Sequence, residues 1–367
     1  MLTPKRELTQ QVSGLNSLRG IAVTAVLFSH VVTVNPDLRK VTPWPWMNQA
    51  FSRGFFGVDL FFVLSGFLIT SLLFRDAEIG ARPMLRVFYI RRALRILPAL
   101  YTLLAASLLV ALWEGFPLSY QWNSTWSALL FISNWTLKSF FLRTQDDIGH
   151  LWSLAVEEQF YLVWPLAFVF LRRFRIHWIA VVTGISVTVL AVAVYRNHLF
   201  HSQVPWLFIY SKTETRADAI LIGCLAAYIY RFVPISLRLL KNLGYIAAMA
   251  FVLLAYFYGD QQKGFLYQGG FTLIAILGGV VVLAAAILPS FGGRLLTSRI
   301  LHWLGQRSYG LYLWHLLVFR IFSRHVTQGP HLLRIALALV VSLVITEMSW
   351  RFIERPFIRL KNLKYGR

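Results

Sequence analysis

The sequence predicts an all-α protein, a polytopic bundle of about ten transmembrane helices with both termini in the cytoplasm. Hydrophobic residues make up 57% of the 367 positions and charged residues only 14%, whereas about a quarter of a soluble domain is charged. So few polar side chains cannot cover the surface of a soluble enzyme, and so much apolar surface excludes a disordered chain. The chain also contains ten separate apolar stretches, and a spanning helix needs roughly 20 mostly apolar residues.

The ten predicted helices follow one another along nearly the whole chain. They are Leu15–Val34, Phe55–Phe74, Ile96–Leu112, Leu151–Leu171, Ile176–Tyr195, Ala217–Tyr230, Leu243–Tyr258, Gly270–Pro289, Ser308–Phe322 and Leu332–Phe352. A weaker stretch, Trp126–Leu142, is interrupted by Ser133, Asn134 and Lys138.

Basic residues set the predicted orientation. The 36 lysines and arginines against 15 acidic residues leave a net charge of +21. In a soluble protein this excess would suggest a nucleic-acid partner; in an apolar chain it indicates basic loops at a lipid bilayer, and no nucleic acid is expected. With the weak stretch outside the membrane, 24 of the 36 basic residues fall on the cytoplasmic side, as the positive-inside tendency requires. We therefore predict that Trp113–Gly149 is an outer loop with an interfacial or re-entrant segment.

The predicted organisation has three parts. Residues 1–14 form a cytoplasmic N-terminal segment, residues 15–357 a membrane domain, and residues 358–367 a basic cytoplasmic tail. The single cysteine, Cys224, excludes an intrachain disulfide framework and a multi-cysteine metal cluster, and no metal is expected.

Several ionisable residues stand inside the predicted helices, where they are costly and usually face a cavity with partners. They are His30, Asp59, Glu157, Glu158, Arg216, Asp218, His315 and Glu347. A neutral imidazole can accept a proton from a hydroxyl near neutral pH, so His30 is a candidate base. Asp59, or Glu157 on a later helix, is the candidate partner that orients it. The alternative for His30 is a packing histidine bonded to a backbone carbonyl.

A second group of polar residues follows one helical face. His150, Leu154, Glu157 and Tyr161 share the repeat that brings side chains to one side of a helix, and Glu158 points roughly 100° away from them. This face suits a polar cavity, although a buried glutamate bonded to an arginine on another helix would explain it too.

The segment Arg75–Arg95 carries six arginines and is predicted as a cytoplasmic loop leading into a helix. Arg92 and Arg95 are three residues apart and would share a helical face, and Arg91 precedes them. Such a pair could bind phosphates bidentately, or the cluster could be an ordinary cytoplasmic anchor. His315 stands in an aromatic-rich segment, Ser308–His315, that could equally be an interfacial belt with packing residues. Gly54, Gly57 and Gly66 are predicted to let helices approach closely.

Taken together, these segments resemble the acyltransferase-3 family of membrane acyltransferases. The matching residues are Leu15–Ala22 with His30, Gly54–Leu68, Phe88–Pro98, His150–Tyr161, Thr215–Asp218, Ser308–His315 and Ile353–Phe357. Each motif alone is weak, but their joint order is specific and covers nearly the whole chain. Asn16 stands where the family often has aspartate.

The resemblance implies a bacterial inner-membrane enzyme that moves an acyl group, usually acetyl, from cytoplasmic acyl-CoA to a sugar hydroxyl of a polysaccharide or glycolipid precursor. By position, His30 matches the proposed catalytic histidine, and Arg92 and Arg95 match the arginine pair near the donor. Asp59 and Glu157 match further catalytic-site positions. The residues expected to line the site are Arg19, His150, Tyr161, Arg216, Asp218 and His315. Some members add an esterase-like domain, and the chain is expected to handle the acceptor without one.

Two rival functions are open at this point. A transporter or flippase for a glycolipid would use the same buried polar groups as a substrate path, but it predicts two repeated halves, and no internal similarity is visible. A structural scaffold is disfavoured, because buried ionisable groups would be a needless cost there.

Overall fold

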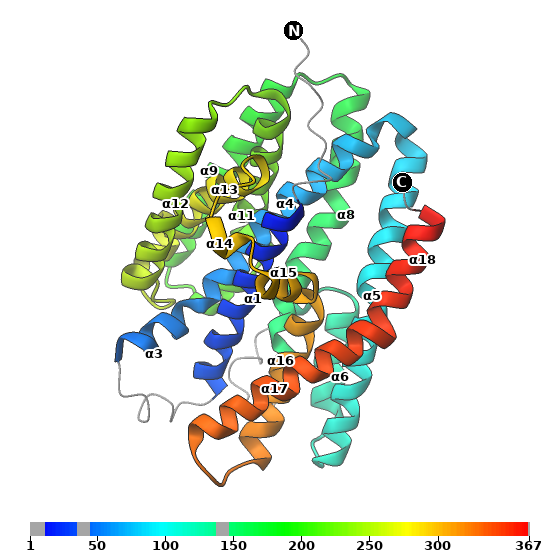
Figure 1. The fold of residues 1–367 in the computed structure, drawn as a ribbon, viewed down its shortest axis with the longest axis vertical. Coiled ribbons are helices and arrows are strands. Elements are labelled where there is room, and N and C mark those ends of the chain that lie inside the picture. The colour runs from blue at the N-terminus through cyan, green and yellow to red at the C-terminus, as the bar shows by residue number, and fades with distance from the viewer. Residues whose placement is uncertain (1–11, 35–44, 137–146, 366–367) are drawn as a thin grey trace. The chain divides into compact units, whose positions relative to one another are not determined.

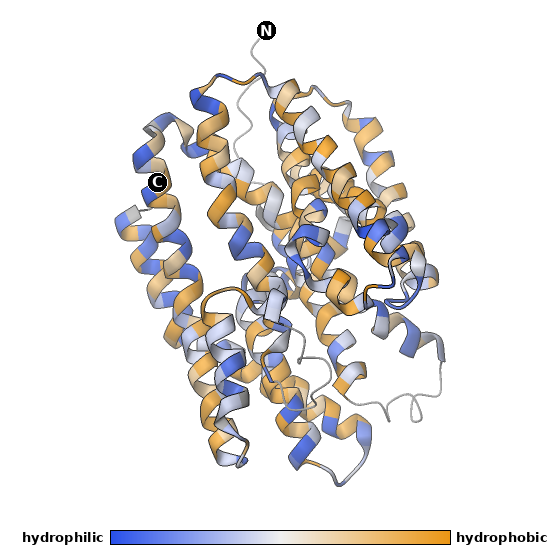
Figure 2. Cartoon of the chain, turned by 180° about the vertical axis from the view of Figure 1, so that it is seen from behind, coloured by the Kyte–Doolittle hydropathy of each residue, from blue (hydrophilic) through white to orange (hydrophobic). Residues whose placement is uncertain are grey.

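The computed structural model describes residues 12–34, 45–136 and 147–365, and all the regular structure in these ranges is helical. The predicted all-α fold is therefore confirmed. Within the described ranges, eight helices are long and apolar enough to cross a membrane, and hydrophobic positions recur along them (Figure 2). The protein is a multi-pass membrane protein.

Each of the ten predicted stretches lies in a helix, and the bundle of about ten helices is confirmed. Two of these helices, α11 (Thr213–Phe232) and α16 (Ser308–His325), are not among the eight apolar spans. Charged residues interrupt α11, and tyrosine, histidine and arginine dilute the apolar sequence of α16. The cytoplasmic location of both termini stays a prediction.

The predicted loop Arg75–Arg95 is wrong, because helix α5 begins at Ala81 and continues to Trp113. Arginine is a good helix former, and the apolar residues between the arginines recur at helical spacing. Met84 and Phe88, four residues apart, are buried by this arrangement. The arginines therefore stand on a continuous helix.

The predicted outer loop Trp113–Gly149 contains two short helices, α6 (Leu118–Leu129) and α7 (Ser133–Thr136). They are separated by a turn in which Phe131 has a positive φ of 54°. The described part of the weak apolar stretch is thus broken rather than continuous, as its polar interruptions predict. Residues 137–146 of this loop lie outside the described ranges.

The chain divides into two compact units. Unit 1 consists of the chain up to Val26, Gln49–Arg75 and Ala167–Gln306. It contains the start of α1 (Val12–Val34), α4 (Phe56–Asp76), α9 (Trp178–His201), α10 (Trp206–Ser211), α11, α12 (Leu237–Tyr258), α13 (Phe271–Ile287), α14 (Gly293–Leu296) and α15 (Arg299–Gln306). Helix α11 packs against α9 and α13, and α12 packs against α13 (Figure 1).

Glycines allow the helices of unit 1 to approach closely. A methyl group at Gly57 would overlap the carbonyl oxygen of Ala22, and one at Gly66 would overlap that of Ile220. Helices α1 and α11 therefore both pass α4 at backbone contact, which is the close packing that small residues permit in membranes. The predicted role of Gly57 and Gly66 is confirmed.

Unit 2 consists of Leu27–Asn48, Asp76–Leu166 and Arg307–Arg367. It contains the end of α1, α5, α6, α7, the 3₁₀ turn η5 (Gly149–Leu151), most of α8 (Trp152–Arg173), α16, α17 (His331–Ser349), the π-turn η7 (Trp350–Glu354) and α18 (Arg355–Tyr365). Helix α16 packs against α17, and α18 lies beside α5 (Figure 1). Leucines of α5, η5, α8 and α16 form the apolar core of this unit: Leu100, Leu103, Leu104, Leu151, Leu154, Leu313 and Leu317.

Candidate active site

Three histidine side chains come together in unit 2. His30 comes from α1, His150 from η5 and His315 from α16. His30 Nδ1 lies 3.1 Å from His315 Nε2, and the ring of His150 is centred 5.0 Å from that of His315 and 6.3 Å from that of His30. His150 and His315 are fully buried. The three residues are predicted individually as site residues, and their contact with one another is the new finding.

Backbone carbonyls of α16 fix two of these rings. His315 Nδ1 lies 3.0 Å from the carbonyl oxygen of Leu311, one turn earlier in the same helix. His150 Nε2 lies 3.2 Å from the carbonyl oxygen of Leu313. Because carbonyl oxygens only accept hydrogen bonds, both of these ring nitrogens must carry hydrogen.

A tyrosine and a serine hold the turn that carries His150. The Tyr312 hydroxyl donates to the carbonyl oxygen of His150 at 2.5 Å, and it lies 2.6 Å from Ser153 Oγ. Since the Tyr312 proton is used, Ser153 is the donor of the second bond. Neither Tyr312 nor Ser153 is predicted from the sequence as a site residue. The spacing could have identified Tyr312, because it stands three residues before His315 and so lies on the same face of the helix.

A second polar cluster in unit 2 surrounds Arg92. Its guanidinium donates twice to Oε1 of Glu158, lies 3.9 Å from Glu157 and is centred 3.6 Å from the Tyr161 ring. Tyr161 in turn donates to Glu157 Oε2 at 3.2 Å. The predicted shared face of Glu157 and Tyr161 is confirmed. Glu158 is predicted to point away from that face. It still contacts Arg92, because the forked guanidinium of Arg92 extends to both carboxylates.

The two other predicted donor-binding arginines differ from Arg92 and from each other. Arg91 forms an ion pair of 2.8 Å with Asp76. Arg95 is partly buried on α5, and among the described residues it makes no hydrogen bond or ion pair. Of these three arginines, Arg95 is therefore the one without a carboxylate partner among the described residues.

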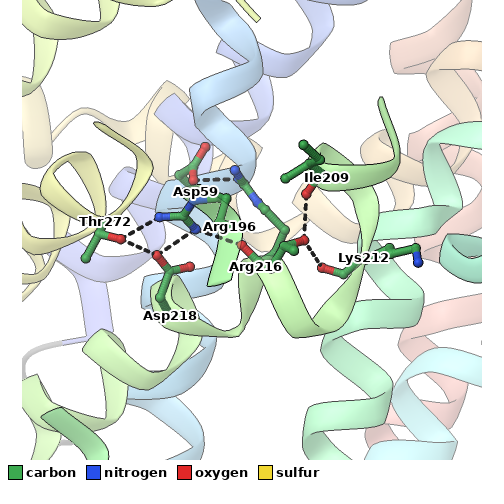
Figure 3. Close-up of polar contacts among 8 residues, drawn as sticks. Asp59, Arg196, Ile209, Lys212, Arg216, Asp218 and Thr272 are labelled. Carbon is green, nitrogen blue, oxygen red and sulfur yellow. Dashed lines mark hydrogen bonds and ion pairs between the residues drawn. The ribbon is translucent and has the colours of Figure 1, made fainter. Parts of the chain in front are cut away.

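Unit 1 holds a separate set of buried charges (Figure 3). Arg216 donates to Asp59 Oδ1 at 2.6 Å, and Arg196 donates to Asp218 Oδ2 at 2.8 Å. All four side chains are at most 2% exposed. Thr272 donates to the same oxygen of Asp218 at 2.6 Å.

The sequence predicts that Asp59 or Glu157 orients His30, and this stays a prediction. In unit 1, Asp59 forms an ion pair with Arg216. In unit 2, Nδ1 of His30 lies beside Nε2 of His315. Arg19 is half-buried on α1. Arg196, which is not predicted from the sequence as a site residue, is a further buried charge of unit 1. In the described part of the chain, no group of three or more histidine, cysteine or acidic side chains is placed to hold a metal ion.

Comparison with known proteins identifies the family. Residues 12–347 match the acyltransferase-3 family, whose description is "acyltransferase domain". The chain belongs to this family. The resemblance drawn from the motifs is confirmed, and no solved structure matches the chain.

Two bacterial relatives have names that specify a reaction. OatA of Listeria monocytogenes, a "peptidoglycan O-acetyltransferase", is 31% identical over 94% of this chain and 55% of its own length. YrhL of Bacillus subtilis, named a "putative peptidoglycan O-acetyltransferase", is 33% identical over 96% of this chain and 56% of its own length. This acyltransferase-family chain therefore spans about half the length of the curated relatives that it matches.

Proposed function

We propose that the protein is a membrane-bound O-acyltransferase that moves an acyl group, acetyl, from cytoplasmic acyl-CoA to a sugar hydroxyl of a cell-surface polymer or glycolipid precursor. The proposed location is the inner (plasma) membrane of a bacterium. The observation that carries the proposal is the partly buried contact of 3.1 Å between His30 and His315, in a chain that belongs to an acyltransferase family.

The proposed reaction needs a base and a proton donor, and His30 can serve as both. Its imidazole takes the proton of the acceptor hydroxyl as the oxygen attacks the thioester carbonyl carbon. A carbon–oxygen bond forms, the carbon–sulfur bond breaks, and the imidazolium returns the proton to the departing thiolate of coenzyme A. General acid–base catalysis of this kind contributes about 10²–10⁴-fold to a rate.

Binding of the anionic donor is assigned to the arginines of α5. Arg95 is the central candidate, because it has no ion pair with the described residues. Arg91 and Arg92 stand on the same helix but already pair with Asp76 and Glu158. We therefore assign phosphate contact to Arg95 first, and a supporting electrostatic role to Arg91 and Arg92.

Peptidoglycan is the acceptor to test first. Both relatives described above carry names that refer to acetylation of peptidoglycan, and a sugar hydroxyl is a suitable nucleophile for the proposed base. The catalytic assignment extends to Glu157, with Tyr161, His150 and His315 lining the site within unit 2.

The test compares the cell-surface polymers of wild-type cells, cells lacking the gene, and cells that carry His30→Ala. Mass spectrometry of the digested glycan should show loss of one acetyl mass per modified sugar in the second and third strains. Membranes must contain equal amounts of folded variant. Unchanged acetylation in the His30→Ala strain would contradict the proposal, and so would transport of a glycolipid without any thioester-dependent product.

A further inference from the structure

We infer that His315 is a positioning residue that fixes the tautomer of His30, so that the basic lone pair of His30 lies on Nε2. The inference rests on the proposed role of His30 in acyl transfer. It follows from the hydrogen-bond partners of the two rings, taken one atom at a time.

The backbone of α16 determines which nitrogen of His315 carries hydrogen. Its Nδ1 faces the carbonyl oxygen of Leu311 at 3.0 Å, and a carbonyl oxygen can only accept. Nδ1 of His315 therefore carries hydrogen. A neutral imidazole has one N–H group, so Nε2 of His315 holds a lone pair. The neutral form is the one expected here, because the ring is 0% exposed and an uncompensated buried charge is costly.

His315 in turn determines which nitrogen of His30 carries hydrogen. Nε2 of His315 lies 3.1 Å from Nδ1 of His30. Because that Nε2 offers a lone pair, the hydrogen between the two rings must belong to His30 Nδ1. The other nitrogen of His30, Nε2, then holds the lone pair of the neutral ring. The carbonyl oxygen of Leu311 in α16 therefore determines the donor and the acceptor in both hydrogen bonds.

The geometry makes this arrangement rigid. The anchoring carbonyl and the His315 ring belong to the same helix, one turn apart, so they move together. His315 also lies against the ring of Phe319, whose centroid is 5.7 Å away. The orientation of His30 therefore depends on a side chain that is itself held by the backbone of α16. This is the role that a carboxylate has in many nucleophile–histidine sites, where a third group orients the base.

The chain Leu311 carbonyl–His315–His30 also has a consequence during the reaction. When His30 takes the proton of the acceptor hydroxyl on Nε2, the ring becomes an imidazolium that still donates through Nδ1 to His315. That hydrogen bond becomes charge-assisted and roughly twice as strong. His315 itself forms and breaks no covalent bond with the substrates, and the proton leaves His30 again from Nε2 to the thiolate.

The experiment measures acetyl transfer from acetyl-CoA by purified full-length variants in detergent. His315→Leu removes the acceptor, whereas His315→Gln offers a side-chain carbonyl oxygen in its place. His201→Leu, an exposed histidine of α9, is the matched control. The inference predicts that His315→Leu lowers kcat by about 10–100-fold, the range seen when a partner that orients a metal-bound histidine is lost, with KM for acetyl-CoA unchanged. It predicts that His315→Gln recovers most of that loss.

Rescue by the conservative variant separates orientation from a merely structural role, because His315→Gln restores an acceptor for His30 Nδ1 without restoring an imidazole. Equal losses of kcat in His315→Leu and His315→Gln would overturn the inference, as would wild-type activity of His315→Leu. The proposed function has a separate test. If His30→Ala keeps its activity, the proposed function is wrong. If His30→Ala is inactive and His315→Leu has wild-type activity, only the role of His315 is wrong.

Discussion

Nε and Nη2 of Arg92 both donate to a single oxygen, Oε1 of Glu158, at 3.1 and 3.0 Å. Two donors on one acceptor make this carboxylate a fixed partner of the arginine, and the Tyr161 ring lies against the same guanidinium. Arg92 is therefore engaged on the protein itself. Arg95, one turn along α5, has no such bond among the described residues, and this asymmetry separates two arginines that the sequence treats as a pair.

The Arg92–Glu158 contact should be measurable as a coupling energy. Arg92→Ala and Glu158→Ala each break both hydrogen bonds, so the double variant should lose less stability than the sum of the single variants. We expect a coupling of about 1–3 kcal/mol, measured by thermal unfolding in detergent. Additive losses would show that the contact does not contribute to stability.

Replacing Arg95 is expected to weaken binding of acetyl-CoA rather than the stability of the fold. Arg95→Gln should raise KM for acetyl-CoA by about 10-fold or more, because a charge-assisted hydrogen bond contributes about 1.5–3 kcal/mol, while the free energy of unfolding stays near that of the wild type. Arg86→Gln, an exposed arginine of the same helix, is the control and should leave KM unchanged. An unchanged KM in Arg95→Gln would remove this residue from the donor site.

The Asp59–Arg216 pair is expected to act on folding. Asp59→Ala leaves the Arg216 charge buried without its partner, since both side chains are 1% exposed. Removing one member of such a pair costs about 3–5 kcal/mol, so the level of folded protein should fall. Replacing both residues with leucine and methionine should restore most of it. A well-folded Asp59→Ala variant with abolished acetyl transfer would instead make Asp59 part of the reaction.

Close packing of α4 against α11 gives a further prediction. Gly66→Ala would push a methyl group into the backbone of Ile220, so the variant should fail to accumulate in membranes or unfold at a markedly lower temperature. Gly184 on α9 has open space around its Cβ position, and Gly184→Ala should gain up to about 1 kcal/mol from helix propensity. Equal stability of the two variants would contradict the observed packing.

Much of the fold could be predicted from the sequence, because hydropathy is a local property. The ten apolar stretches all lie in helices, and the contact between Glu157 and Tyr161 follows from their spacing of four. The start of α5 was not predictable in this way. A run of arginines suggests a loop when charge alone is considered, although the spacing of Met84 and Phe88 already favours a helix.

The pairing of distant residues could not be predicted. His30 and His315 are separated by 285 positions, and Asp59 and Arg216 by 157. Hydropathy identifies each of them as unusual at its place, but their partners depend on how the helices pack. Asp59 is the clearest case, since its position in the motif suggests a partner for His30 and the structure gives it Arg216.

The most direct test of the account is the rate of acetyl transfer by His30→Gln compared with the wild type, at equal amounts of folded protein and with radiolabelled acetyl-CoA as the donor. If His30 is the base, the rate should fall by about 100-fold or more, while KM for acetyl-CoA changes little. A rate within a few-fold of the wild type would contradict the assignment of His30 and, with it, the proposed mechanism.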